Sequence, residues 1–163
     1  MHYDETAVPD PISPYGAAKA AAETAVKAIV PAAVIARTSL ILGDGSQTQE
    51  LVHRLAGGTE GMLFEDDIRC AGHVDDLASA LLALAWSDRR GVHHLAGAEP
   101  VSRYQLDRLV AAHDGPDPDS LRAGRRANSG VPGPLDVRLE CPATQAVLKT
   151  RLRGASEFLR AEG

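Results

Sequence analysis

The feature that most constrains the fold is an apolar run over residues 32–42, AAVIARTSLIL, which lies between Pro31 and a glycine-rich turn at 43–46. Proline ends a preceding helix, and β-branched residues in a nearly unbroken apolar stretch are typical of a parallel strand buried on both faces. Parallel strands need crossover connections, which are usually helical. The run therefore predicts an α/β fold with a parallel sheet.

The segments around this strand show further helical and extended patterns. An alanine-dense helix is predicted over 17–29, with Pro14 at its start. Residues 113–133 are rich in Gly, Pro, Asp and Arg and predict a long surface loop. A helix is predicted from a Thr48 cap to about Ala56, and another from Asp75 or Asp76 to Asp88, with Leu77, Leu81, Leu84 and Ala85 on one apolar stripe. A further helix is predicted to begin at Ser102, with Leu106, Leu109 and Val110 at helical spacing, and two helical pieces are predicted over 144–161, separated near Gly154. Short extended segments are predicted at 62–64 and 92–95.

Composition indicates one ordinary domain and excludes several classes of function. The chain has 163 residues, a net charge of −5 and 4% aromatic residues, which disfavours a nucleic-acid partner. The cluster of Arg122, Arg125 and Arg126 is interpreted as a solvated loop. We find no secretory signal and no apolar stretch long enough for a bilayer, so we expect a cytoplasmic protein without a membrane partner. Cys70 and Cys141 are too far apart to indicate a zinc site or a disulfide framework.

The strongest local signal is Tyr15 followed four residues later by Lys19. On a helix this spacing places the phenol and the ammonium on one face, about 6 Å apart. A neighbouring ammonium favours the phenolate, as acid/base chemistry at neutral pH requires. The pair alone occurs easily by chance, and its structural alternative is an exposed helix start.

Longer segments carry a resemblance to a known family. PDPISPYGAAKAAAE resembles the active-site helix of the extended short-chain dehydrogenase/reductases, and VIARTSLILG, RCAGHVDDLASALLAL and GVHHLAGAEPVSRYQL are similar to its later segments in the same order. SGVPGPLDVRLEC and TRLRGASEFL resemble the C-terminal region of the dTDP-4-dehydrorhamnose reductase branch. The resemblance covers Tyr3 to Leu159. It implies an incomplete Rossmann-like C-terminal half with a small substrate-binding lobe, forming a single domain over 1–163.

The resemblance also implies a set of site residues and ligands. It implies NAD(P) as cofactor and a nucleotide sugar as substrate, with no metal. Tyr15 and Lys19 are the implied catalytic residues; Tyr15, Lys19, Thr38, Ser39 and Leu40 are implied to contact the cofactor, and Arg37, Gly43, Arg69 and His73 the substrate.

The chain departs from the family pattern in three places. No glycine-rich turn precedes Tyr15, and Gly43-Asp44-Gly45 lacks the third glycine of a pyrophosphate loop. No candidate matches the family's catalytic Ser or Thr, since Ser13 belongs to the lead-in turn. Gly133-Pro134 stands where the branch has Arg-Pro, so an arginine facing the substrate is not expected there. We therefore expect the N-terminal dinucleotide-binding part to be absent and this chain alone to be inactive.

Other polar residues have structural interpretations. His93 and His94 would point to opposite faces of a strand, so these histidines and His73 are interpreted as packing or surface residues and not as metal ligands. Asp75 and Asp76 are interpreted as helix caps, as favoured for acids at a helix start.

Three hypotheses remain open from the sequence. The chain is the nucleotide-sugar-binding portion of a reductase or epimerase, a non-catalytic binding or regulatory subunit with the same fold, or a fragment of a longer enzyme. An uncovered buried-type strand invites pairing, so we expect a homo-oligomer or a companion chain that supplies the missing sheet.

Overall fold

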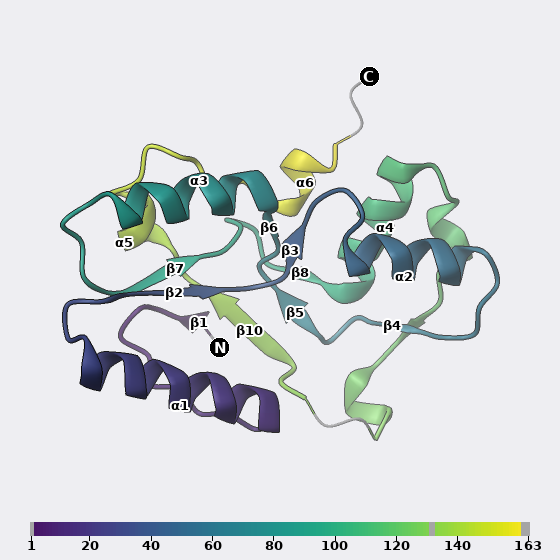
Figure 1. Cartoon of the computed structure of the whole chain (residues 1–163). Helices are drawn as coiled ribbons and strands as arrows, with labels where there is room; N and C mark the ends of the chain where they lie inside the picture. The colour runs from purple at the N-terminus through teal and green to yellow at the C-terminus, as the bar shows by residue number, and fades with distance from the viewer. Residues whose placement is uncertain (1, 131–132, 161–163) are drawn as a thin grey trace.

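A parallel pair of strands lies between two long helices. The computed structural model describes residues 2–130 and 133–160. Strand β2 (Val34–Thr38) pairs in parallel with β7 (Gly91–Leu95), with Val34 opposite Gly91 and Thr38 opposite Leu95. Helices α1 (Pro14–Ile29) and α3 (Val74–Ala85) lie on opposite sides of this pair (Figure 1). The predicted α/β fold with parallel strands is confirmed.

The long strand predicted over 32–42 is divided in two. After β2 the chain leaves the pair with β7, and β3 (Ile41–Leu42) pairs instead with β6 (Gly72–His73). Between the two strands, the Ser39 hydroxyl accepts a hydrogen bond of 3.2 Å from the backbone N–H of Cys70. The prediction of one continuous strand was wrong, because Ser39 and Leu40 separate β2, which pairs with β7, from β3, which pairs with β6.

A second sheet joins segments that the sequence pattern did not identify. Its order is β1 (His2–Tyr3), β10 (Asp136–Leu139), β5 (Ile68–Arg69) and β8 (Val101–Ser102), and only the β5–β8 pair is antiparallel among these strands. Elements of two to four residues are too short for hydrophobic periodicity to reveal them.

The segment predicted as a long surface loop contains ordered structure. Strand β9 (Ala123–Gly124) pairs with β4 (Leu63–Phe64), and two short 3₁₀ helices, η1 (Pro118–Ser120) and η2 (Arg126–Asn128), lie on either side of it. Leu121 is buried in the core. The loop prediction was therefore wrong for much of 113–133.

The helix starts agree with the sequence in one case and differ in two. Ser102 caps α4 (Arg103–Asp114) as predicted. Ser46, and not Thr48, caps α2 (Gln47–Ala56) in a capping box with Gln49. His73 caps α3, and Asp76 binds Arg153 instead of capping.

Two short helices form the C-terminal segment, α5 (Pro142–Gln145) and α6 (Ala155–Phe158). Helix α6 begins after Gly154, as predicted. Ala161, the predicted end of this region, lies outside the described residues.

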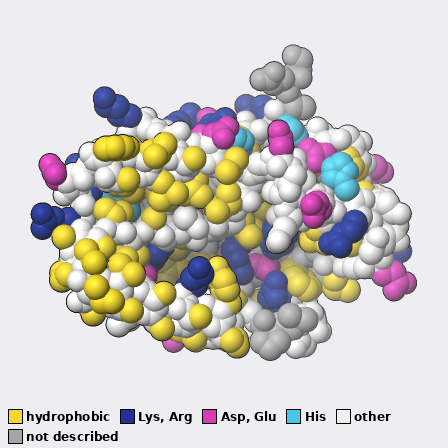
Figure 2. Space-filling view, in the orientation of Figure 1, with side chains coloured by type: hydrophobic (Ala, Val, Ile, Leu, Met, Phe, Trp, Pro, Cys, Tyr) yellow, Lys and Arg dark blue, Asp and Glu magenta, His cyan; other side chains and the backbone are white. Residues whose placement is uncertain are grey.

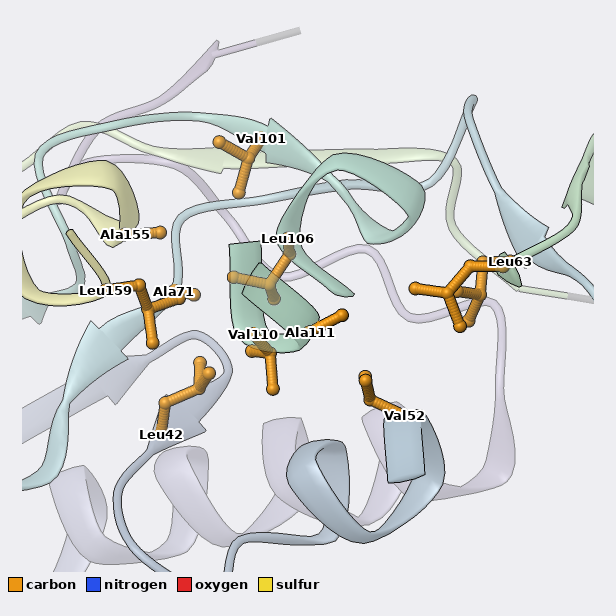
Figure 3. Packing of buried hydrophobic residues seen from close by; sticks show 11 residues of the cluster. Leu42, Val52, Leu63, Ala71, Val101, Leu106, Val110, Ala111, Ala155 and Leu159 are labelled. Atoms are coloured by element: carbon orange, nitrogen blue, oxygen red, sulfur yellow. The ribbon is translucent and has the colours of Figure 1, made fainter. Parts of the chain in front are cut away.

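The main hydrophobic core lies beside the parallel pair, around α4 (Figure 3). Leu106, Val110 and Ala111 of α4 meet Val52 of α2 and Leu42 of β3. A smaller cluster under α3 contains Ala80, Leu84, Leu95 and Leu152. Leu81, predicted on the buried stripe of α3, is instead 40% exposed, because Ala80 and Leu84 face β7.

The two helices beside the parallel pair carry much exposed apolar surface. Helix α1 has no buried residue, and its Val26 and Ile29 are exposed. On α3, Leu82 and Trp86 at the end of the helix are also exposed, and Trp86 is 89% exposed. Figure 2 shows hydrophobic side chains gathered over the part of the molecule that contains α1 and α3. Exposed apolar patches of this kind are typical of surfaces that another polypeptide covers.

Candidate functional site

Tyr15 and Lys19 lie together on the first turns of α1. Ser13 caps the helix by accepting a hydrogen bond from the Gly16 N–H, and Pro14 occupies the first helical position. The Lys19 Nζ atom lies 5.6 Å from the centroid of the Tyr15 ring. Tyr15 is 75% exposed, so its hydroxyl is accessible to a ligand.

This end of α1 lies at the same end of the fold as the carboxyl terminus of β2. Helix α1 and strand β2 run in opposite directions (Figure 1). Thr38 at the end of β2 is exposed, and Leu40 reaches the pocket described next. In Rossmann-like proteins, ligands bind beyond the carboxyl ends of parallel strands.

Four arginines line a pocket of 620 Å³ between α2, α4, β5 and η2. They are Arg54, Arg69, Arg103 and Arg126, and the acidic lining residues are Glu50 and Asp67. Lys and Arg side chains are visible in the hollow on the face shown in Figure 2. A concave site with an excess of guanidinium groups is suited to phosphate or carboxylate recognition.

Asp67 orients two of these arginines. Its Oδ2 accepts hydrogen bonds from Arg126 Nε at 2.9 Å and Nη2 at 2.5 Å, and its Oδ1 lies 2.7 Å from Arg69 Nη1. The Arg126 guanidinium also stacks 4.7 Å from the Phe64 ring centroid. Arg126 is thus a fixed pocket residue, and the interpretation of it as part of a solvated loop was wrong; Arg122 and Arg125 are exposed as expected.

Arg69 is held by the backbone as well as by Asp67. Its Nη1 donates to Ile68 O at 2.7 Å and its Nη2 to Pro134 O at 2.9 Å. Burial lowers the pKa of Arg69, and the positive charges of Arg126 and Arg103 lower it further. The segment with Gly133-Pro134 therefore contributes a carbonyl that orients Arg69, while Arg126 supplies an arginine that the sequence comparison did not predict.

Arg103 is held more loosely at the floor of the pocket. Its Nη1 lies 3.4 Å from the Thr48 hydroxyl, and its Nη2 lies 3.5 Å from Asp107 Oδ2, one turn further along α4. Asp107 is fully buried, and its Oδ1 has no hydrogen-bond partner among the described residues. Burial raises the pKa of Asp107 to about 6. The positive charge of Arg103 lowers this pKa, and the negative charge of Asp67 raises it.

Three expected substrate residues have other partners. Arg37 donates to both carboxylate oxygens of Glu23 and to Ala7 O, and it does not line the arginine pocket. The His73 ring caps α3 through Asp75 N and packs edge-on against Phe158 at 5.2 Å. Gly43 lets the chain pass close to α3, because an added Cβ would lie 2.5 Å from Val74 Cγ1.

The remaining histidines have structural contacts. His94 is buried, as the packing interpretation predicts, and its Nδ1 lies 3.0 Å from Glu140 O. His93 Nδ1 lies 3.3 Å from the Thr144 hydroxyl. We find no group of three or more His, Cys, Asp or Glu side chains able to hold a metal within 2–130 and 133–160. The same part of the chain contains no helix long and apolar enough to cross a membrane.

The fit of a dinucleotide cofactor differs between two parts of the described chain. Thr38 is exposed at the carboxyl end of β2, and Tyr15 and Lys19 are exposed at the same end of the fold, where Rossmann-like proteins bind ligands. The turn after β3 does not fit a pyrophosphate, because Ser46 there caps its own helix and Gly43 packs against Val74.

The sequence identified Arg69 but missed Arg54, Arg103 and Arg126. Arg54 and Arg103 lie on the exposed or polar sides of helices, where arginine is common and gives no local signal. Only the packing of α2 against α4, and of η2 against Asp66 and Asp67, brings them together. The parallel strand pair flanked by helices, with Thr38 exposed at the carboxyl end of β2, defines a chain of the Rossmann-like α/β class.

Comparison with known proteins identifies the family within this class. Residues 1–160 match the RmlD substrate binding domain, and the chain belongs to this family, the dTDP-4-dehydrorhamnose reductase branch of the extended short-chain dehydrogenase/reductases. A dTDP-4-dehydrorhamnose reductase of Mycobacterium tuberculosis (strain ATCC 25618 / H37Rv) is 37% identical over 135 residues, which are 80% of this chain and 43% of that protein. The chain thus spans less than half the length of this curated relative.

Solved structures show the same fold. A dTDP-4-dehydrorhamnose reductase from Bacillus anthracis str. Ames in complex with NADP has a TM-score of 0.82 and 22% identity, over 97% of this chain and 57% of that chain. MoeE5 in complex with UDP-glucose and NAD has a TM-score of 0.75 and 24% identity, over 98% of this chain and 57% of that chain. The structural neighbours thus bind NAD or NADP, and one binds a nucleotide sugar.

Proposed function

We propose that this chain is the nucleotide-sugar-binding portion of an NAD(P)-dependent reductase of the dTDP-4-dehydrorhamnose reductase type. The observation that carries the proposal is the pocket with Arg54, Arg69, Arg103 and Arg126 beside Leu40. A nucleotide sugar has a diphosphate with two negative charges, which guanidinium groups bind through paired hydrogen bonds. Family membership and the curated relative support dTDP-sugars as the class of ligand.

Within this proposal, Tyr15 and Lys19 act on the sugar. Bound NAD(P)H would supply the hydride for the carbonyl carbon. The exposed Tyr15 hydroxyl donates a proton to the carbonyl oxygen, and Lys19, 5.6 Å from the ring, stabilises the phenolate that remains. Since the turn after β3 does not fit a pyrophosphate, we propose that the chain alone is inactive.

The binding proposal is tested by isothermal titration calorimetry with dTDP-glucose. We expect Arg69→Gln and Arg126→Gln each to weaken binding about tenfold or more, because each removes a charged hydrogen-bond donor from the pocket. Arg89→Gln is the matched control, since Arg89 is exposed after α3 and does not line the pocket. Absence of measurable binding by the unmodified chain, or equal loss in the control, would reject the proposal.

A second candidate is a non-catalytic subunit that pairs with another polypeptide. It is favoured by β2, which has β7 as its one strand partner in the described part, and by α1, which buries no side chain. We propose that a companion chain or a second copy places strands beside β2 and covers α1. Native mass spectrometry would detect this assembly together with any retained nucleotide. A monomer without nucleotide at all concentrations would contradict it.

A further inference from the structure

A buried carboxyl group, Asp107, contacts the arginine pocket only through the lining residue Arg103, so no ligand bound there could touch it directly. Asp107 is 0% exposed, and Arg103, whose side chain is 16% exposed, lies between it and the pocket. The two side chains meet at 3.5 Å across one helical turn of α4. Asp107 therefore acts on the pocket through Arg103.

The protein leaves the Asp107 carboxylate poorly satisfied. A buried carboxylate normally accepts several hydrogen bonds, yet Oδ2 has only the long contact with Arg103 and Oδ1 has none among the described residues. Arg103 is equally weakly held, since its contact with Thr48 is 3.4 Å long. A guanidinium with two long contacts keeps donors available for a stronger acceptor.

We infer that Asp107 is a positioning residue of the arginine pocket, which holds Arg103 from behind and competes with an anionic ligand for that guanidinium. The inference rests on the proposed function, because it concerns the same pocket. When a diphosphate binds Arg103, its negative charge comes close to the buried carboxylate of Asp107. Ligand binding is therefore linked to neutralisation of Asp107, and the ligand binds more tightly when Asp107 is protonated.

The groups around Asp107 support this assignment. Asp67 repels its carboxylate and Arg103 attracts it, and burial raises its pKa to about 6. The elements packed against α4 place other charges nearby: Glu50, His53 and Arg54 on α2, Asp119 in η1, and Glu157 on α6. Arg69 on β5 and Arg126 on η2 line the same pocket as Arg103. Several of these are already paired, His53 with Asp114, Asp119 with Arg108 and Glu157 with Arg151.

The test is calorimetry with dTDP-glucose at pH 5 and pH 8, where the charge of its diphosphate does not change. We expect the unmodified chain to bind about tenfold more tightly at pH 5, as a buried unit charge near the ligand is removed. Asp107→Asn should bind equally at both pH values, near the affinity of the unmodified chain at pH 5. Asp75→Asn, at an exposed carboxylate on α3, is the control and should keep the full pH dependence.

Two further results separate this inference from the proposed function. Arg103→Gln should weaken binding and remove the pH dependence with Asp107 intact, because Asp107 acts through Arg103. Sulfate, whose double charge is also constant, is titrated in parallel. If sulfate binding shows a pH dependence that requires Asp107, but dTDP-glucose does not bind, the nucleotide-sugar proposal fails and the positioning role of Asp107 stands. Persistence of the pH dependence in Asp107→Asn, or no anion binding at all, would overturn the inference.

Discussion

Arg37 binds Glu23 through both carboxylate oxygens, with Nε 3.0 Å from Oε2 and Nη2 2.7 Å from Oε1. Its third contact, from Nη1 to Ala7 O at 2.9 Å, attaches the N-terminal segment. One side chain of β2 thus fixes α1 and the segment before it. Because α1 has no buried side chain, this ion pair is a principal attachment of the helix that bears Tyr15 and Lys19.

Glu23→Gln should destabilise the chain in a pH-dependent way. The hydrogen bonds from Arg37 lower the pKa of Glu23 from 4.5 to about 2. A lowered pKa in the folded state gives stability that is fully present above about pH 4.5 and is lost as the pH falls toward 2. We expect a loss of about 1–3 kcal/mol in the free energy of unfolding at pH 7 and little difference near pH 2. Urea titrations at both pH values measure this, with Glu60→Gln, at an exposed residue, as control.

How far the sequence could predict this molecule is clear from the same helix. Ser13-Pro14-Tyr15-Gly16 contains a cap and a first-turn proline, so the position of Tyr15 and Lys19 followed from local chemistry. The assignment of Arg37 to substrate could not be checked locally, because its partner Glu23 is fourteen residues away and meets it only after α1 folds against β2. Arg126 was missed for the same reason, since its partners Asp66 and Asp67 are 60 and 59 residues away in the sequence.

Tyr15→Phe should remove catalysis without affecting binding. The hydroxyl is exposed and makes none of the hydrogen bonds that hold α1, so its loss leaves the helix intact. In an assembly that contains the dinucleotide-binding part, we expect reductase activity to fall about 100-fold or more, the usual contribution of general acid catalysis. NADPH oxidation measures the reductase activity, and calorimetry with dTDP-glucose measures the binding affinity. Unchanged activity in the variant would show that another group donates the proton.

The two cysteines should react slowly in the folded chain. Burial raises the pKa of Cys70, and it raises the pKa of Cys141 to about 11. Thiol reagents attack the thiolate, so a pKa two units above the ordinary value of 9 leaves about one hundredth of the usual reactive form. Reaction with Ellman's reagent at pH 8 should be slow until guanidinium is added. Cys70→Ser isolates the behaviour of Cys141, and a fast phase in the folded Cys70→Ser chain would contradict this prediction.

Leu106→Ala should be among the most destabilising single changes. Leu106 is 0% exposed and lies at the centre of the cluster in Figure 3, where α4 meets α2 and β3. Removing three carbon atoms there loses burial and leaves a cavity, which costs about 2–5 kcal/mol. Leu82→Ala is the matched control, because Leu82 is 61% exposed on α3 and its truncation leaves no cavity in the single chain. Chemical denaturation of the isolated chain measures both. If a companion polypeptide covers the exposed apolar face of α3 as well as α1, Leu82→Ala should weaken that assembly while leaving the unfolding midpoint of the single chain unchanged. The same pair of variants then distinguishes the inner core from a surface that binds a partner.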